Sequence, residues 1–240
     1  MAVKQREKFY RILNFRIMKK KYLWGALGAI LILALLVFLS DRKENKLTYI
    51  SDHIQVLEEN KMSEMNQDSK ELKPPSQMII DENKVYSAVL KTTAGDITIK
   101  LNNQATPKTV NNFVYLSELG FYDGVIFHRV IDGFMIQGGD PNGDGTGGPG
   151  YQFADEPFDG EYDRGTVAMA NSGPNTNGSQ FFIMHQDNDL PKNYVIFGQV
   201  IDGMAVVDKI ATVPVKVNGA GENSTPVSPV VINSAEILTP

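Results

Sequence analysis

Residues 127–141 read FHRVIDGFMIQGGDP, and residues 169–183 read MANSGPNTNGSQFFI. In both segments short apolar runs are bounded by Gly, Pro and Asn, which favour turns. Short strands joined by tight turns are typical of an all-β barrel or sandwich. The strands predicted here and in the immediate flanks cover residues 125–130, 134–137, 166–170 and 180–184.

Four further strands are predicted outside the two quoted segments. Apolar and polar residues alternate on both sides of the turn TTAGD, residues 92–96, which is the pattern of half-buried strands. These four strands cover residues 85–90, 95–101, 195–200 and 230–238.

Two helices are predicted between the strands. Thr106 opens the first as its N-cap, Pro107 stands in the first turn, and Gly120 closes it. Asp202 is expected to cap the second helix, over residues 203–210. The whole pattern indicates an all-β domain over residues 85–240, with helical caps.

The two quoted segments, together with the ending VIFGQVIDGMAVVDKI at residues 195–210, resemble the cyclophilin family. The resemblance extends from residue 85 to about residue 238. It implies an eight-stranded antiparallel barrel closed at its ends by two helices. It also implies peptidyl-prolyl cis/trans isomerase activity without a cofactor, on proline-containing unfolded or extended polypeptides.

The chemistry of that reaction suits the residues present. Resonance gives the amide bond a rotation barrier of about 18–20 kcal/mol, and neither a nucleophile nor a metal is required to lower it. In the twisted amide the prolyl nitrogen regains its lone pair, so a fixed guanidinium can donate a hydrogen bond to it in the transition state. Arg129 matches the family's catalytic arginine, and Gln137 matches the side chain that steadies it.

The resemblance also implies a substrate site around Arg129. The proline ring needs flat apolar walls, and backbone groups at the pocket edge bind the extended peptide. His128 matches the histidine beside the arginine, for which the reaction needs no acid or base role. The residues implied to bind substrate are His128, Phe134, Met135, Ala170, Asn171, Gln180, Phe182, Leu190 and Tyr194.

Two positions depart from the family pattern. Asp189 stands where the family commonly has an aromatic residue, often Trp, and Tyr194 stands in place of the pocket histidine. That tryptophan contributes strongly to cyclosporin binding and less to catalysis. We therefore expect weak cyclosporin binding with activity retained.

No metal, cofactor or nucleic acid is expected. The loop GGDPNGDGTGGPGY, residues 138–151, contains a G-x-G-x-x-G match without a following helix and an EF-hand-like start that ends on Tyr151 instead of Glu. The chain has no Cys, which excludes disulfides and thiolate ligands. Residues 1–21 hold eight Lys or Arg and one Glu, so the remainder is strongly acidic and a poor nucleic-acid binder.

The chain is expected to begin with a membrane anchor. Residues 22–39 carry no charge, and the preceding basic segment, residues 1–21, is expected to stay in the cytoplasm. Residues 40–84 are predicted to form a polar linker to the exported domain. The alternative is a cleaved signal peptide that leaves a secreted protein, although the exit FLSDRKEN has no small-residue cleavage pattern.

The main prediction is a single-pass enzyme of the cell membrane, acting outside the cytoplasm on Xaa-Pro bonds during protein folding. A second hypothesis is a membrane-tethered module that binds proline peptides with little turnover, because Asp189 and Tyr194 alter the pocket. A third is a structural membrane protein whose barrel serves only assembly.

Overall fold

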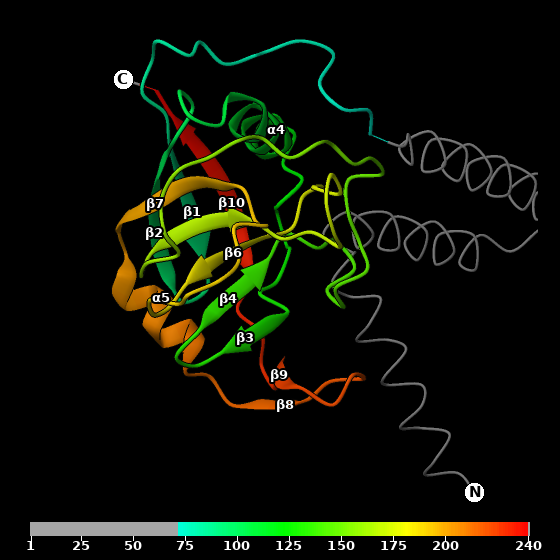
Figure 1. The fold of residues 1–240 in the computed structure, drawn as a ribbon. Helices are drawn as coiled ribbons and strands as arrows, with labels where there is room; N and C mark the ends of the chain where they lie inside the picture. The colour runs from blue at the N-terminus through cyan, green and yellow to red at the C-terminus, as the bar shows by residue number, and fades with distance from the viewer. Residues whose placement is uncertain (1–71, 240) are drawn as a thin grey trace, which may run out of the picture. The chain divides into compact units, whose positions relative to one another are not determined.

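Eight antiparallel strands form one curved sheet in the computed structural model, which describes residues 72–239 (Figure 1). The strand order across the sheet is β10-β1-β2-β7-β5-β6-β4-β3. The strands are β1 (Ser87–Thr92), β2 (Gly95–Leu101), β3 (Arg129–Ile131), β4 (Met135–Gly138), β5 (Thr166–Met169), β6 (Phe181–Met184), β7 (Ile196–Asp202) and β10 (Ile232–Leu238).

Backbone hydrogen bonds join the two edges of this sheet. The N–H of Phe127 donates to the Val230 carbonyl (3.0 Å), and the N–H of Ile232 donates to the Val125 carbonyl (2.8 Å). The strand predicted over 125–130 begins only at Arg129, where the pairing with β4 starts, because Val125 and Phe127 bond to residues 230–232 instead. The predicted eight-stranded antiparallel sheet with two helices is confirmed.

Strands β5 and β6 are buried on both faces. Since side chains alternate along a strand, Phe181 and Ile183 enter the main core, while Phe182 and Met184 pack in a second, smaller cluster. This second cluster underlies the candidate site described below.

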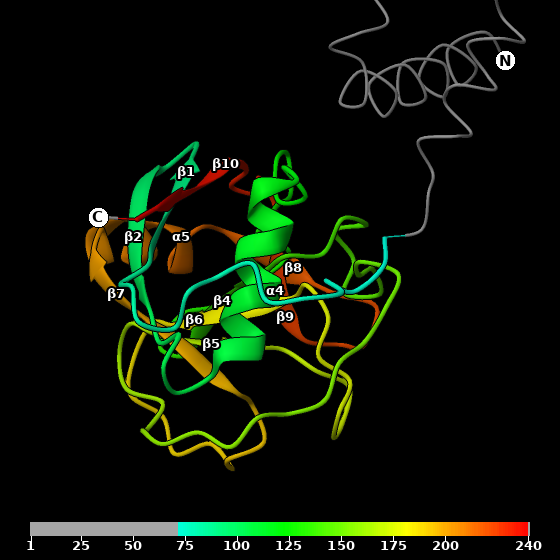
Figure 2. The same ribbon diagram turned by 90° about the horizontal axis from the view of Figure 1, so that it is seen from above.

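Helix α4 (Pro107–Glu118) lies against β10 and is seen across the front of the domain in Figure 2. Thr106 is its N-cap residue, but the Thr106 hydroxyl makes no capping bond and donates to the Ile196 carbonyl (3.2 Å). The buried carboxylate of Glu156 instead accepts the N–H groups of Lys108 (2.9 Å) and Thr109 (2.6 Å). Thr106 is thus the N-cap residue, as predicted, but the capping hydrogen bonds come from Glu156.

Helix α5 (Met204–Ala211) lies at the other end of the sheet, packed on β2, β3 and β4 (Figure 1). Its N-cap is Gly203 rather than the predicted Asp202. Gly203 has φ +89°, and a Cβ there would lie 2.3 Å from the Asp96 carbonyl oxygen. Only glycine meets both demands, because it has no Cβ.

A short hairpin of β8 (Val215–Val217) and β9 (Asn223–Pro226) was not expected from the sequence. Its strands have only three and four residues, and β9 reads NSTP, so the hairpin lacks the longer apolar alternation that predicts a strand. The hairpin packs beside β3 (Figure 1) and brings residues 218–222 to the candidate site.

The predicted polar linker, residues 40–84, is described only from residue 72 onward. In that part, the N–H groups of Ile79 and Ile80 both donate to the Asn111 side-chain oxygen, at 2.7 and 3.3 Å. The predicted anchor, residues 22–39, lies outside the described residues. Among residues 72–239, no helix has the length and apolar character that crossing a bilayer requires.

Candidate active site

Arg129 and Gln137 face each other across the β3–β4 pair. The Arg129 Nη1 donates to Gln137 Oε1 (3.3 Å) and lies 3.8 Å from the Met135 sulfur. Both partners come from β4, so the strand pairing itself directs this edge of the guanidinium. The structure thus brings together the two residues that were predicted to be catalytic.

Glu222 binds the other edge of the same guanidinium. Its carboxylate accepts hydrogen bonds from Arg129 Nε and Nη2, each 2.7 Å long. The Arg129 side chain lowers the pKa of Glu222 to about 2. Sequence analysis missed Glu222 because it lies 93 residues further along the chain, in a polar loop without a motif.

A cavity of about 240 Å³ opens beside Arg129. All of its lining residues were predicted site residues, and they come from β3, β4, β6 and three loops. The lining consists of Arg129, Phe134, Met135, Gln137, Ala170, Asn171, Phe182, Leu190 and Tyr194. Its apolar side chains offer the flat walls that a proline ring needs.

Aromatic packing holds the wall of this cavity, which we call the proline pocket. The Phe182 and Tyr194 rings meet edge to face, with centroids 5.6 Å apart. Behind them, the buried Tyr162 hydroxyl donates to the Tyr194 carbonyl (2.8 Å) and accepts the Tyr194 N–H (3.1 Å). Tyr162 was not predicted as a site residue, and no local pattern distinguishes it from a core residue.

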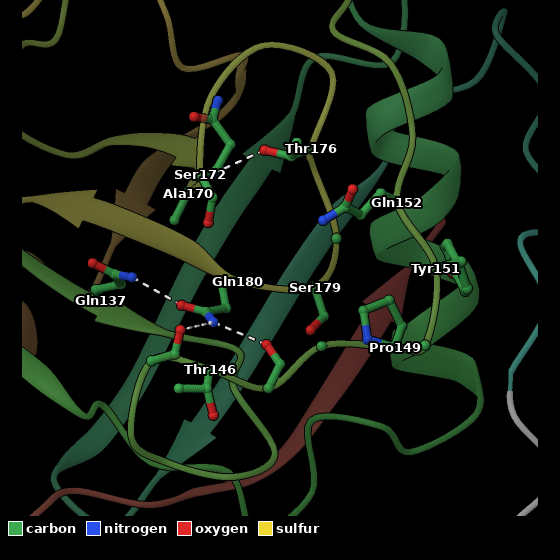
Figure 3. Close-up of a pocket in the computed structure, with 16 residues that line it drawn as sticks. Gln137, Thr146, Pro149, Tyr151, Gln152, Ala170, Ser172, Thr176, Ser179 and Gln180 are labelled. Atoms are coloured by element: carbon green, nitrogen blue, oxygen red, sulfur yellow. Dashed lines mark hydrogen bonds between the residues drawn. The ribbon is translucent and has the colours of Figure 1, made fainter.

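Gln180 is absent from the lining of the proline pocket and instead lines a larger polar cavity of about 560 Å³, shown in Figure 3, which shares Gln137, Ala170 and Asn171 with the pocket. Gln180 Oε1 accepts a hydrogen bond from Gln137 Nε2 (2.9 Å). Its Nε2 donates to the carbonyls of Gly145 (3.0 Å) and Gly147 (2.9 Å). A continuous chain of hydrogen bonds therefore runs from Glu222 through Arg129, Gln137 and Gln180 to the glycine-rich loop.

Asp140 shapes that glycine-rich loop. Its carboxylate accepts the backbone N–H groups of Asn142 (2.7 Å), Asp144 (3.1 Å) and Gly145 (2.5 Å). These bonds explain the run of Asp, Asn and Gly that resembles the start of a calcium loop. Within residues 72–239, no group of three or more His, Asp or Glu side chains is placed to hold a metal ion.

His128 does not line the proline pocket. It is buried and lines a second cavity of about 410 Å³, together with Arg129, Gln137 and the β8–β9 hairpin. Neither ring nitrogen has a hydrogen-bond partner within the described residues. Burial lowers the pKa of His128, so the ring is neutral at pH 7.

The two departures from the family pattern differ in position. Tyr194 lines the proline pocket, whereas Asp189 is exposed and is not among the lining residues. Leu190, next to Asp189, does line the pocket. Position 189 therefore lies at the rim of the pocket rather than inside it.

Comparisons with known proteins agree with this geometry. The family model described as cyclophilin type peptidyl-prolyl cis-trans isomerase/CLD matches residues 87–237. Over 165 residues the chain is 46% identical to a probable peptidyl-prolyl cis-trans isomerase B of Mycobacterium tuberculosis, covering 62% of this chain and 53% of the relative. It thus spans about half the length of that relative. Peptidyl-prolyl cis-trans isomerase B of Streptomyces anulatus is 47% identical over 172 residues, covering 63% of this chain and 96% of the relative.

Solved structures show the same likeness. The crystal structure of a cyclophilin type peptidyl-prolyl cis-trans isomerase from Cryptosporidium parvum matches with a TM-score of 0.58 and 38% identity, covering 65% of this chain and 99% of that one. A second structure of that protein was determined in the presence of the dipeptide Ala-Pro. The chain belongs to the cyclophilin-type peptidyl-prolyl cis-trans isomerase family.

Proposed function

We propose that this protein catalyses cis/trans rotation of Xaa-Pro bonds. One observation carries the proposal: a guanidinium, fixed between Gln137 and Glu222, stands in the wall of a cavity whose aromatic and aliphatic side chains suit a proline ring. Family membership supports it, and so does the Ala-Pro dipeptide used with the related Cryptosporidium parvum protein.

The reaction needs a donor that acts on the twisted amide. As the bond rotates, the prolyl nitrogen loses conjugation and becomes a hydrogen-bond acceptor. Arg129 keeps its charge at every physiological pH and offers N–H groups that are aimed before the substrate arrives. A donor that binds the twisted amide more strongly than the planar amide lowers the barrier to rotation, and no covalent bond is broken.

The apolar walls have a complementary role. Phe134, Phe182 and Leu190 would hold the ring in place while the preceding residue rotates around it. They also displace water from Arg129, which strengthens its hydrogen bond to the substrate. Extended or unfolded polypeptides are the expected substrates, since the Xaa-Pro bond must be accessible.

The N-terminal residues extend the proposal to location. The uncharged run at residues 22–39, preceded by basic residues, supports a single-pass anchor with the catalytic domain outside the cytoplasm. Protease treatment of right-side-out and inverted membrane vesicles tests this. Domain cleavage only in right-side-out vesicles is expected, and cleavage only in inverted ones contradicts this topology.

Isomerisation of a short Ala-Pro peptide, followed with the full chain in mild detergent, tests the activity. We expect the wild-type protein to be active and Arg129→Ala to lose about 100- to 1000-fold, as for the loss of one preorganised donor. Asp96→Asn removes an exposed ion pair with Lys91 at the β1–β2 hairpin and serves as a control with unchanged activity. A folded wild-type protein that binds the peptide without turnover would instead support the binding-module hypothesis.

A further inference from the structure

We propose that Glu222 is a positioning residue for Arg129: it holds the plane of the guanidinium so that the edge facing the proline pocket is free to donate. This inference rests on the proposed isomerase function. It assigns a role to the β8–β9 hairpin, whose connecting loop supplies Glu222.

The donors of the guanidinium divide between two tasks. Arginine has five N–H donors in a rigid plane. Glu222 takes one on Nε and one on Nη2, and Gln137 takes one on Nη1. Of the two donors that remain, the one on Nη1 makes only a long contact with the Met135 sulfur (3.8 Å). Nη1 and Nη2, and not Nε, are therefore left for the substrate.

Glu222 is itself held in place by its own loop. Asn218 Oδ1 accepts the N–H groups of Ala220 and Glu222, both at 2.9 Å. The Asn218 N–H donates to the Glu222 carbonyl (2.8 Å), and Gly221 takes the positive φ of +86° that lets the loop close. The Asn218 amide in turn donates to the hydroxyl of the buried Ser224 (3.2 Å).

An ordinary surface ion pair would not combine a bidentate contact with a loop whose hydrogen bonds hold the carboxylate in place. The Arg129 and Glu222 side chains are 33% and 37% exposed, so simple attraction between them contributes little to stability. The bidentate contact and the bonds that hold both partners point to orientation as the role of the pair. The other ion pairs of Lys or Arg with Asp or Glu in residues 72–239 join Lys91 to Asp96, Arg164 to Asp208 and Lys192 to Glu161, all outside the proline pocket.

Orientation affects catalysis more than binding. A long arginine side chain without Glu222 samples several rotamers, and only some aim a donor at the prolyl nitrogen. Geometry fixed before the substrate binds lowers the barrier, and a misplacement of about 1 Å costs as much as 100-fold in rate. The apolar walls bind the proline ring in both the planar and the twisted state of the amide, and loss of Glu222 leaves them unchanged.

Three variants of the full chain test the role: Glu222→Ala, Glu222→Gln and Glu222→Asp. We expect kcat to fall about 10- to 100-fold in Glu222→Ala, with KM changed less than about twofold. Glu222→Asp keeps the charge and should recover part of kcat. Glu222→Gln offers one acceptor instead of two and should resemble the alanine variant. Asp96→Asn is the matched carboxylate control.

A double-mutant cycle separates positioning from general damage. In the Arg129→Ala background, Glu222→Ala should cause no further loss, because its effect passes through Arg129. Equal fractional losses in both backgrounds would overturn the inference, as would an active wild-type protein whose Glu222→Ala variant keeps its full kcat.

The NMR signal of the Arg129 Nε–H group gives a readout independent of turnover. In the wild-type protein this proton should exchange slowly, and in Glu222→Ala it should exchange rapidly. Fast exchange in the wild type would refute the positioning role of Glu222, even if all variants were inactive. An inactive, folded wild-type protein with a slowly exchanging Nε–H would refute only the isomerase function.

Discussion

The carboxylate of Glu156 caps helix α4 at Thr109, 47 residues earlier in the chain. It accepts both the Thr109 N–H and the Thr109 hydroxyl at 2.6 Å, and it is 8% exposed. A distant loop therefore supplies the acceptor for the first turn of α4, although Thr106 occupies the N-cap position.

We predict that Glu156→Ala destabilises the domain by about 2–4 kcal/mol, because it leaves two N–H groups and a hydroxyl without a partner in a buried setting. Urea unfolding of the purified protein measures this. Glu156→Gln should cost less, since one acceptor remains. Glu118→Ala, at the exposed C-terminal end of the same helix, should stay within about 0.5 kcal/mol of wild type.

Gln137 connects Arg129 to Gln180, so its loss should disturb both sides of the site. We expect Gln137→Ala to lower kcat/KM by about 10- to 100-fold, the equivalent of one hydrogen bond to a charged group. The peptide isomerisation assay checks this, with thermal unfolding as the measure of integrity. A value within twofold of wild type would show that strand pairing and Glu222 aim the arginine without it.

His128 should make the protein less stable in mild acid. Its pKa in the folded state is lowered by burial, so between the ordinary value near 6.5 and the lower folded value the unfolded chain binds more protons. The stabilising effect of the neutral ring is fully present above about pH 6.5 and declines as the pH falls. The loss of Tm between pH 7.5 and 5.0 should be smaller in His128→Gln than in wild type, and an equal loss would exclude His128 as its source.

The contribution of Glu222 to stability should also be lost as the pH falls, but at a far lower pH than that of His128. Arg129 lowers the folded pKa of Glu222 to about 2, so the pair's contribution is complete above about pH 4.5 and is lost as the pH falls toward 2. The difference in Tm between wild type and Glu222→Gln should therefore stay constant from pH 8 to 5 and shrink below that. A difference that already vanishes at pH 5 would contradict the close ion pair.

Cyclosporin should bind weakly, because Asp189 places an exposed carboxylate where an aromatic ring would otherwise extend the rim beside Leu190. We expect Asp189→Trp to raise the affinity about tenfold or more, since an indole adds a large apolar contact. Isothermal titration measures the affinity. Isomerase activity should change less than about threefold in the same variant, and tight binding by the wild-type protein would refute the prediction.

The strands and most of the proline pocket follow from the sequence. Alternation of apolar and polar residues predicted β2 over Gly95–Leu101 with its observed bounds, because a strand buries every second side chain. The segments around Arg129, Phe134 and Phe182 resemble the family closely enough to place nine pocket residues. Four of those residues lie on β3, β4 and β6, which pair directly, and the other five lie in the loops that flank the strands.

The tertiary structure alone decided the contacts between distant segments. Glu156 caps a helix from 47 residues away, and Glu222 reaches Arg129 across 93 residues, in each case from a polar loop without periodicity. His128 is adjacent to Arg129 in sequence and lines a neighbouring cavity together with it, yet His128 is absent from the lining of the proline pocket. Sequence patterns act over a few residues, whereas a carboxylate's partner depends on where the folded chain brings donors together.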